Sequence, residues 1–248
     1  MAEEKRLTLT EHLRELRSRV IRVVIALVVT TAFALFNILN FTDQVFRILL
    51  VPAGGMKPIF IEITEMLTTY FKVALLTGFI LALPFTLYQV IMFVAPGLRP
   101  QERRWLFIFL PAAFVSFILG AAFCYFVLLP PAVRFLLSFG GDLVTPQIRI
   151  SNYMDLVLGL MFWVGIVFET PLVMYFLARL GIVSPQALGR FRKFFVVLAF
   201  VIAAVITPTP DPINQALVAV PLIILYELGV QLARLAARAR RRAQKSPS

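Results

Sequence analysis

The feature that most limits what this chain can fold into is a long apolar run with one acid inside it. Between Leu156 and Leu177 the chain places thirteen Leu, Ile, Val or Phe residues, and Glu169 stands among them. Each such residue favours membrane insertion by about 0.3 to 0.6 kcal/mol, which together outweighs the roughly 3 kcal/mol that one charged residue costs at a helix centre. The sequence therefore predicts a membrane-spanning helix that carries a carboxyl group.

An acid at this depth indicates either a functional site or a polar contact between helices of the same chain. Pro171 follows two residues later and lacks a backbone donor, so we expect the helix to bend beside the acid. Arg179 lies ten residues beyond Glu169, about 15 Å along a helix, which places the acid deep but nearer the basic side. We interpret Glu169 and Pro171 as an intramembrane site for a polar group, with the internal contact as the alternative.

The rest of the chain has the same apolar character. Hydrophobic residues make up 60% of it and charged residues 15%, with a mean hydropathy of +0.89, whereas soluble domains are nearer half apolar and a quarter charged. We predict an all-α integral membrane protein in which the last two spans are shorter than the roughly 30 Å of hydrocarbon. The six predicted spans are residues 20–39, 68–94, 105–129, 154–178, 194–207 and 213–231.

Basic residues are distributed unevenly around these spans. Eighteen Lys or Arg residues fall on the side of the N-terminus and four on the opposite side, so both termini are predicted to be cytoplasmic. The chain then divides into an amphipathic cytosolic segment at residues 1–19, a membrane domain at 20–231 and a basic cytosolic tail at 232–248. We expect the tail to lie against anionic lipid headgroups. No aromatic platform accompanies it, so nucleic-acid binding is not predicted.

Two long loops are predicted on the side opposite the termini. The first, residues 40–67, is amphipathic enough to rest on the membrane surface, and Thr64 with Glu65 can cap the helix that follows. In the second loop, residues 130–152, we expect a short helix through 134–139.

No catalytic pattern is present. The chain has one histidine and one cysteine, which removes histidine clusters, disulfide frameworks and cysteine-based metal sites. Glycine motifs for nucleotides, a HExxH motif and paired intramembrane aspartates are also absent. We therefore predict no enzyme, cofactor or metal. The alternative to a protein-handling function is a proton-coupled small-solute transporter that uses Glu169, although no internal repeat is detectable.

Several blocks, in chain order, resemble one known family. They are His12-Leu-Arg-Glu15-Leu-Arg17-Ser-Arg19, Leu83-Pro84 with Tyr88-Gln89, Phe93-Val-Ala-Pro96-Gly-Leu98 with Glu102-Arg-Arg104, Phe123-Cys-Tyr125, Gly165-Ile-Val-Phe168-Glu169-Thr-Pro171, and Thr209-Pro210-Asp211 with Leu225-Tyr226-Glu227. Together they are similar to the TatC family, the polytopic subunit of the twin-arginine protein translocase. The resemblance implies a concave six-span bundle in the cytoplasmic membrane.

The resemblance also implies a function. Members of this family act as receptors that recognise the twin-arginine signal peptides of folded precursors and nucleate a Sec-independent translocon. Their partners are TatA and TatB, several copies share a receptor complex, and the proton-motive force drives transport.

Particular residues match positions with a role in the family. The implied signal-peptide-binding residues are Glu15, Arg17, Phe93, Glu102 and Arg103, the implied groove residues are Glu169 and Pro171, and Asp211 is the implied outer-loop residue. Two carboxylates suit two guanidinium groups, because each planar fork can pair with both oxygens. For Glu15 a second interpretation is open, an ordinary i,i+4 ion pair with Arg19 on a solvated helix face.

Overall fold

A computed structural model shows a chain of α-helices. It describes residues 9–36, 39–55, 57–94, 100–138, 147–207 and 211–245, with side chains throughout except at 9, 39–42, 94, 100–107 and 241–245. Across these ranges no β-strand forms, and a single parallel bridge joins Ile59 to Arg149. The prediction of an all-α fold is confirmed.

The chain forms two compact units. One contains residues 1–44 and 71–114, and the other contains residues 45–70 and 115–248. The helices are α1 (Leu9–Phe36), α2 (Leu39–Leu50), the 3-10 turn η1 (Val51–Ala53), α3 (Glu65–Val94), α4 (Pro100–Phe123), the π-helical turn η3 (Cys124–Leu128), α5 (Leu129–Ser138), α6 (Ile150–Phe168), α7 (Thr170–Leu180), α8 (Pro185–Ile206) and α9 (Pro212–Lys245).

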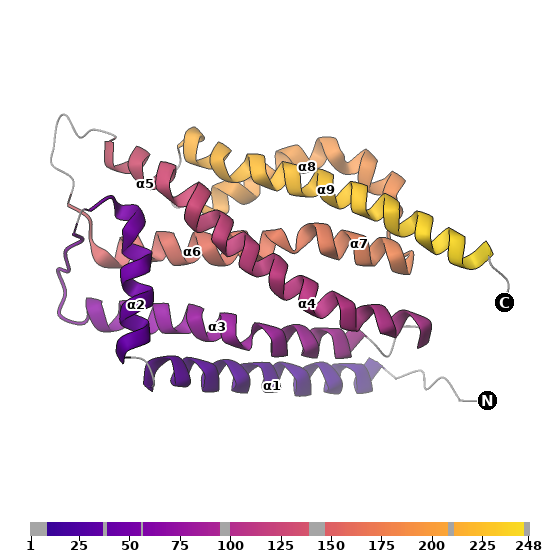
Figure 1. Cartoon of the computed structure of the whole chain (residues 1–248), viewed down its shortest axis with the longest axis horizontal. Coiled ribbons are helices and arrows are strands. Elements are labelled where there is room, and N and C mark those ends of the chain that lie inside the picture. The colour runs from indigo at the N-terminus through magenta and orange to yellow at the C-terminus, as the bar shows by residue number, and fades with distance from the viewer. Residues whose placement is uncertain are drawn as a thin grey trace. The chain divides into compact units, whose positions relative to one another are not determined.

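In the first unit, α1 and the 71–94 part of α3 lie side by side and run in opposite directions (Figure 1). Small residues allow the close approach: Ala34 packs against Ala74 with both fully buried, and Gly78 faces Thr31. The Thr30 hydroxyl donates to the Gly78 carbonyl at 2.8 Å. Because lipid offers no hydrophobic drive to pair helices, small residues and hydroxyls of this kind hold membrane helices together.

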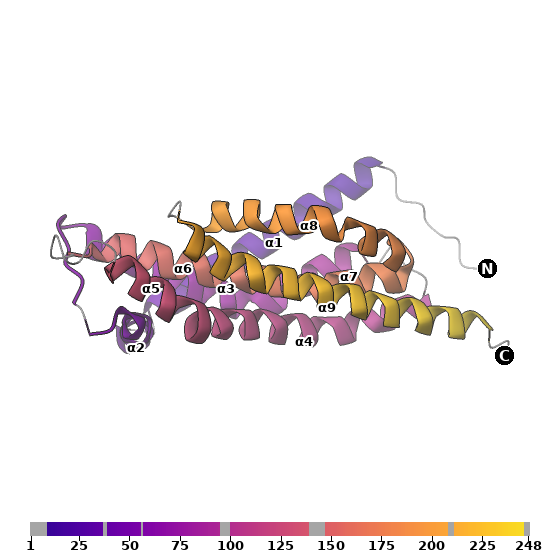
Figure 2. The ribbon, with the colours of Figure 1, turned by 90° about the horizontal axis from the view of Figure 1, so that it is seen from above.

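In the second unit, α8 and α9 form an antiparallel pair (Figure 2). The rings of Phe195 and Tyr226 stack with centroids 3.9 Å apart, and the Tyr226 hydroxyl donates to the Leu188 carbonyl at 2.7 Å. An adjoining face of α9 packs on α7, where Gly229 lies against Pro171 and Met174. The side chains of both neighbouring helices thereby hold α9 in position.

Among the residues that the structure describes, five helical segments are long and apolar enough to cross a membrane. They are Thr10–Phe36, Glu65–Phe93, Ile108–Ser138, Ile150–Leu180 and Pro212–Arg240. The remaining long helix, α8, carries Arg190, Arg192 and Lys193 in its first half, so its apolar part is residues 194–206, about 20 Å of helix. The predicted second and third spans fall inside longer helices, the fourth covers most of α6 and α7, and the first starts eleven residues inside α1. The sixth predicted span, 213–231, lies inside the 34-residue α9, so the helix there is longer than the short span that was predicted.

Both predicted loops contain more helix than expected. Within residues 40–67, α2 and η1 are helical, and the chain turns at Gly54 and Gly55, whose φ angles are positive. The short helix expected at 134–139 instead begins at Leu129 and continues α4 through η3. Pro130 and Pro131 lack backbone donors, and the π-helical turn, in which the Leu129 amide bonds to the Cys124 carbonyl, absorbs the irregularity.

Candidate functional site

Glu169 stands at the break between α6 and α7. The Glu169 amide donates to the Ile166 carbonyl at 3.0 Å, a tightened turn, and helix α7 resumes at Thr170. Pro171 cannot donate to the carbonyl four residues before it, which is why the helix is interrupted here. The neighbouring Phe168 carbonyl accepts a 2.7 Å hydrogen bond from the Ser116 hydroxyl of α4 instead. The helix is thus interrupted beside the acid, where the sequence predicted a bend.

The Glu169 carboxyl group is turned into the protein. It lies against the backbone of Phe117, a residue 2% exposed, and its Oε1 atom is buried with no hydrogen-bond partner among the described residues. Gly165 supports this arrangement, because a Cβ there would lie 2.5 Å from the Phe117 ring. A buried oxygen without a partner is costly, so this atom is suited to accept or donate one further hydrogen bond.

Glu15 lies where the start of α1 meets the end of α3. Its Oε1 atom accepts from Arg19 Nε at 3.0 Å, and Arg19 Nη1 also donates to Gln89 Oε1 of α3 at 3.3 Å. Three residues before Glu15 on α1, the His12 ring stacks on Phe93 with centroids 4.4 Å apart. The i,i+4 ion pair foreseen for Glu15 is therefore present, and Phe93 lies in the same neighbourhood.

The other predicted signal-peptide residues are only partly placed. Arg17 is exposed on α1. Glu102 and Arg103 belong to the first turn of α4, within the same compact unit as Glu15, but their side chains lie outside the described residues.

Asp211 caps helix α9. Its Oδ1 atom accepts from the Asn214 backbone amide at 2.7 Å, and its Oδ2 atom accepts from the Asn214 side chain at 2.9 Å. These are the bonds of an N-cap residue, worth about 1 kcal/mol. Asp211 thus stabilises the start of α9.

An ion cluster around Glu65 was not foreseen from the sequence. The sequence pattern indicates that Glu65 caps a helix. In the structure its side chain is only 2% exposed, and its Oε2 atom accepts a hydrogen bond from Arg149 Nε at 2.9 Å. Backbone amides of Ile61 and Ser151 donate to the same carboxylate, each at 3.0 Å. Hydrogen bonds with Glu62 and Glu65 raise the pKa of Arg149. The cluster joins the two long loops, which the bridge between Ile59 and Arg149 also connects.

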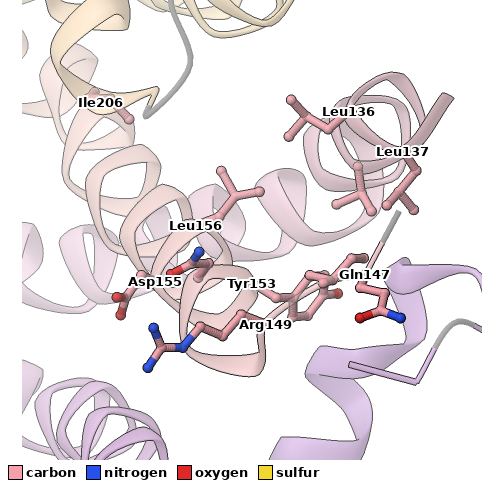
Figure 3. A pocket seen from close by; sticks show the side chains of 11 residues that line it. Leu136, Leu137, Gln147, Arg149, Tyr153, Asp155, Leu156 and Ile206 are labelled. Carbon is pink, nitrogen blue, oxygen red and sulfur yellow. The ribbon is translucent and has the colours of Figure 1, made fainter. Parts of the chain in front are cut away.

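A cavity of about 550 Å³ opens beside this cluster (Figure 3). Leu136 and Leu137 of α5 form one wall, and Tyr153 and Leu156 of α6 form another. The Tyr153 hydroxyl is committed, because it donates to the Leu49 carbonyl at 2.8 Å. Arg149 and Asp155 also line the cavity, and most of the other lining side chains are apolar. Across the described part of the chain, no group of acids, cysteines and histidines is placed to hold a metal ion.

Comparison with known proteins decides the family. A family model described as TatC, Sec-independent protein translocase protein, matches residues 11–221. The chain belongs to the TatC family. It is 42% identical to the Sec-independent protein translocase protein TatC of Carboxydothermus hydrogenoformans over 234 residues, covering 94% of this chain and 95% of that protein. It is 41% identical to the protein of the same name from Aquifex aeolicus over 244 residues, covering 96% and 99%.

A solved TatC structure has the same fold. The crystal structure titled as the twin-arginine translocase receptor TatC superposes with a TM-score of 0.80 at 40% identity, covering 92% of this chain and all of that one. A second crystal structure of the receptor, in the detergent DDM, gives a TM-score of 0.81. The resemblance noted in the sequence is confirmed, and the family is that of a protein translocase component.

Proposed function

We propose that this TatC family member is the receptor for twin-arginine signal peptides, and that the peptide's two arginines pair with Glu15 and Glu102. The observation that carries the proposal is the junction of α1 and α3, where the His12–Phe93 stack holds the start of α1, which bears Glu15, against the end of α3. A carboxylate fixed on a rigid helix pair is a better receptor for a guanidinium fork than one on a free chain. Arg17 and Arg103 flank the two acids and orient the bound peptide.

The proposal extends to the assembly of the translocon. The chain spans the cytoplasmic membrane six times with both termini in the cytoplasm, α8 providing the fifth and shortest span, as the charge bias supports. Glu169 with Pro171 forms a groove site at which a polar side chain of TatA or TatB reaches the buried Oε1 atom. Several copies share the receptor complex, and the proton-motive force drives translocation.

Photocrosslinking of a twin-arginine signal peptide to membranes containing this chain tests the receptor proposal. Glu15→Gln and Glu102→Gln should each lower the crosslinking yield much more than Glu11→Gln, which removes a carboxylate from the same end of α1. A peptide with two lysines in place of the arginines should bind weakly to the unmodified chain, because lysine lacks the planar fork. Equal losses from all three glutamine variants would contradict the proposal.

Disulfide crosslinking tests the groove site separately. Glu169→Cys should form disulfides with cysteines placed along the single spans of TatA or TatB, whereas Trp163→Cys, on an exposed position of α6, should react much less. Disulfides that form only within this chain would support the internal polar contact instead.

A further inference from the structure

A groove lined mainly by arginine lies between the start of α8 and the basic part of α9. Its volume is about 630 Å³, and its lining includes Gly189, Arg190 and Arg192 from α8 with Arg234 and Arg238 from α9. These five residues define what we call the arginine groove. The two helices are already joined nearby by the Phe195–Tyr226 stack, so the groove is part of the packed helix pair and not a chance gathering of mobile side chains.

The positive charge of the groove is poorly balanced. Arg192 Nη2 pairs with Glu227 at 2.6 Å, and Arg234 Nη1 donates to the neutral side chain of Gln231 at 3.2 Å. Within the described part of the chain, Arg190 and Arg238 have no hydrogen-bond or ion-pair partner. The Arg192 Nε atom is buried and also lacks a partner there. Among the four arginines of the groove, only Arg192 is thus paired with a carboxylate, which leaves several guanidinium donors available to an anionic ligand.

The groove adjoins an exposed apolar face of α8. Arg190, Phe194, Val197 and Val201 recur at i, i+4, i+7 and i+11, so they follow one face of the helix. The three apolar residues are 69%, 66% and 55% exposed. Four arginines, of which only Arg192 is paired with a carboxylate, are followed directly by this exposed apolar stripe. Such an arrangement is typical of the depth at which phosphate headgroups meet hydrocarbon.

We propose that the arginine groove binds the phosphate headgroup of an anionic phospholipid, whose acyl chain lies along Phe194, Val197 and Val201. Guanidinium forks match phosphate oxygens bidentately, and the adjoining apolar face accounts for the hydrophobic part of such a ligand. An acidic protein segment would use the arginines but would have no use for that face, so the lipid fits both observations. This inference concerns a surface other than the signal-peptide site and does not rest on it.

Native mass spectrometry of the purified full-length chain, titrated with phosphatidylglycerol or phosphatidylcholine, tests the proposal. The unmodified protein should prefer phosphatidylglycerol. Arg190→Gln/Arg238→Gln should lower that affinity roughly tenfold or more, since each basic residue near a lipid surface contributes measurably. The matched control is Arg14→Gln/Lys193→Gln, which removes the same charge from exposed positions outside the groove, and it should change the affinity less than about twofold.

Two further variants separate a built site from general positive charge. Gly189→Leu adds no charge but fills open space, because a Cβ at Gly189 meets no atom within 4 Å, and it should also weaken phosphatidylglycerol binding. Glu227→Gln removes the carboxylate paired with Arg192 and should strengthen it. Equal losses in the two double variants would overturn the proposal, as would displacement of the lipid by millimolar inorganic phosphate or by an oligoglutamate peptide.

Discussion

The Ser116 hydroxyl donates a 2.7 Å hydrogen bond to the carbonyl oxygen of Phe168, the residue directly before Glu169. This bond satisfies a carbonyl next to the α6–α7 break, where the helix ladder is interrupted by Pro171. It ties α4 to the bend and so fixes the direction in which the Glu169 side chain leaves the helix. The backbone around the acid is therefore stabilised by a side chain more than fifty residues away in the sequence.

Ser116→Ala should destabilise the protein by about 1 kcal/mol, in the range for hydrogen bonds between membrane helices. The thermal unfolding midpoint in detergent measures this loss. The matched control is Ser138→Ala, which removes an exposed hydroxyl that bonds only three residues back, to Phe135, and it should leave the midpoint nearly unchanged. If the proposed partner contact at Glu169 is real, Ser116→Ala should also reduce crosslinking from Glu169→Cys, because the bend would no longer be held.

Glu65→Gln should be among the more destabilising single changes in the chain, by about 2 to 4 kcal/mol. The carboxylate accepts hydrogen bonds from Arg149 and from the backbone amides of Ile61 and Ser151. The glutamine side chain has only one acceptor oxygen, and its NH2 group would face one of these donors. Glu62→Gln is the matched control, because that carboxylate is 65% exposed and bonds to the same arginine. It should cost less than about 1 kcal/mol. Similar unfolding midpoints for the two variants would show that burial of Glu65 matters little.

The location of Glu169 and the bend at Pro171 could be predicted from the sequence because both follow from neighbouring residues: an apolar run, one acid and one proline. The same holds for the all-α membrane class, which composition alone indicates. The Glu15–Arg19 pair was also within reach, since residues four apart on a helix are adjacent. In each of these cases the structure depends on residues that are close together in the sequence.

The Glu65 cluster lay beyond such reasoning. Two of its partners, Arg149 and Ser151, are 84 and 86 residues away along the chain, and Thr64 followed by Glu65 before an apolar run is most simply interpreted as a helix start. The continuous α4–α5 helix was missed for a related reason, because Pro130 and Pro131 normally end a helix and the π-helical turn that accommodates them has no sequence signature. The division of α8 into a charged and an apolar half was visible, but its pairing with α9 was not.

Gly78→Ala should separate α1 from α3. A Cβ at Gly78 would lie 2.5 Å from Thr31 Oγ1 and 2.7 Å from Thr31 Cα, and a backbone atom cannot turn aside as a flexible side chain can. We expect a loss of about 1 to 3 kcal/mol, measured as the unfolding midpoint. Gly159→Ala, at a helical glycine where a Cβ meets nothing within 4 Å, should be neutral or slightly stabilising. Equal behaviour of the two variants would mean that α1 and α3 do not depend on this close approach.

Arg19→Gln should raise the affinity for a twin-arginine peptide several-fold, if Glu15 receives one of the peptide's arginines. Arg19 already occupies the Glu15 carboxylate and is itself held by Gln89, so a guanidinium group arriving from the peptide has to displace it. Removing Arg19 frees the acceptor and also removes a repelling cation. Arg22→Gln, one turn further along α1 at an exposed position, removes the same charge without touching Glu15 and should have a smaller effect. Fluorescence anisotropy of a labelled signal peptide against detergent-solubilised protein measures both. A lower affinity in Arg19→Gln would show that Arg19 positions Glu15 for the peptide instead of competing with it.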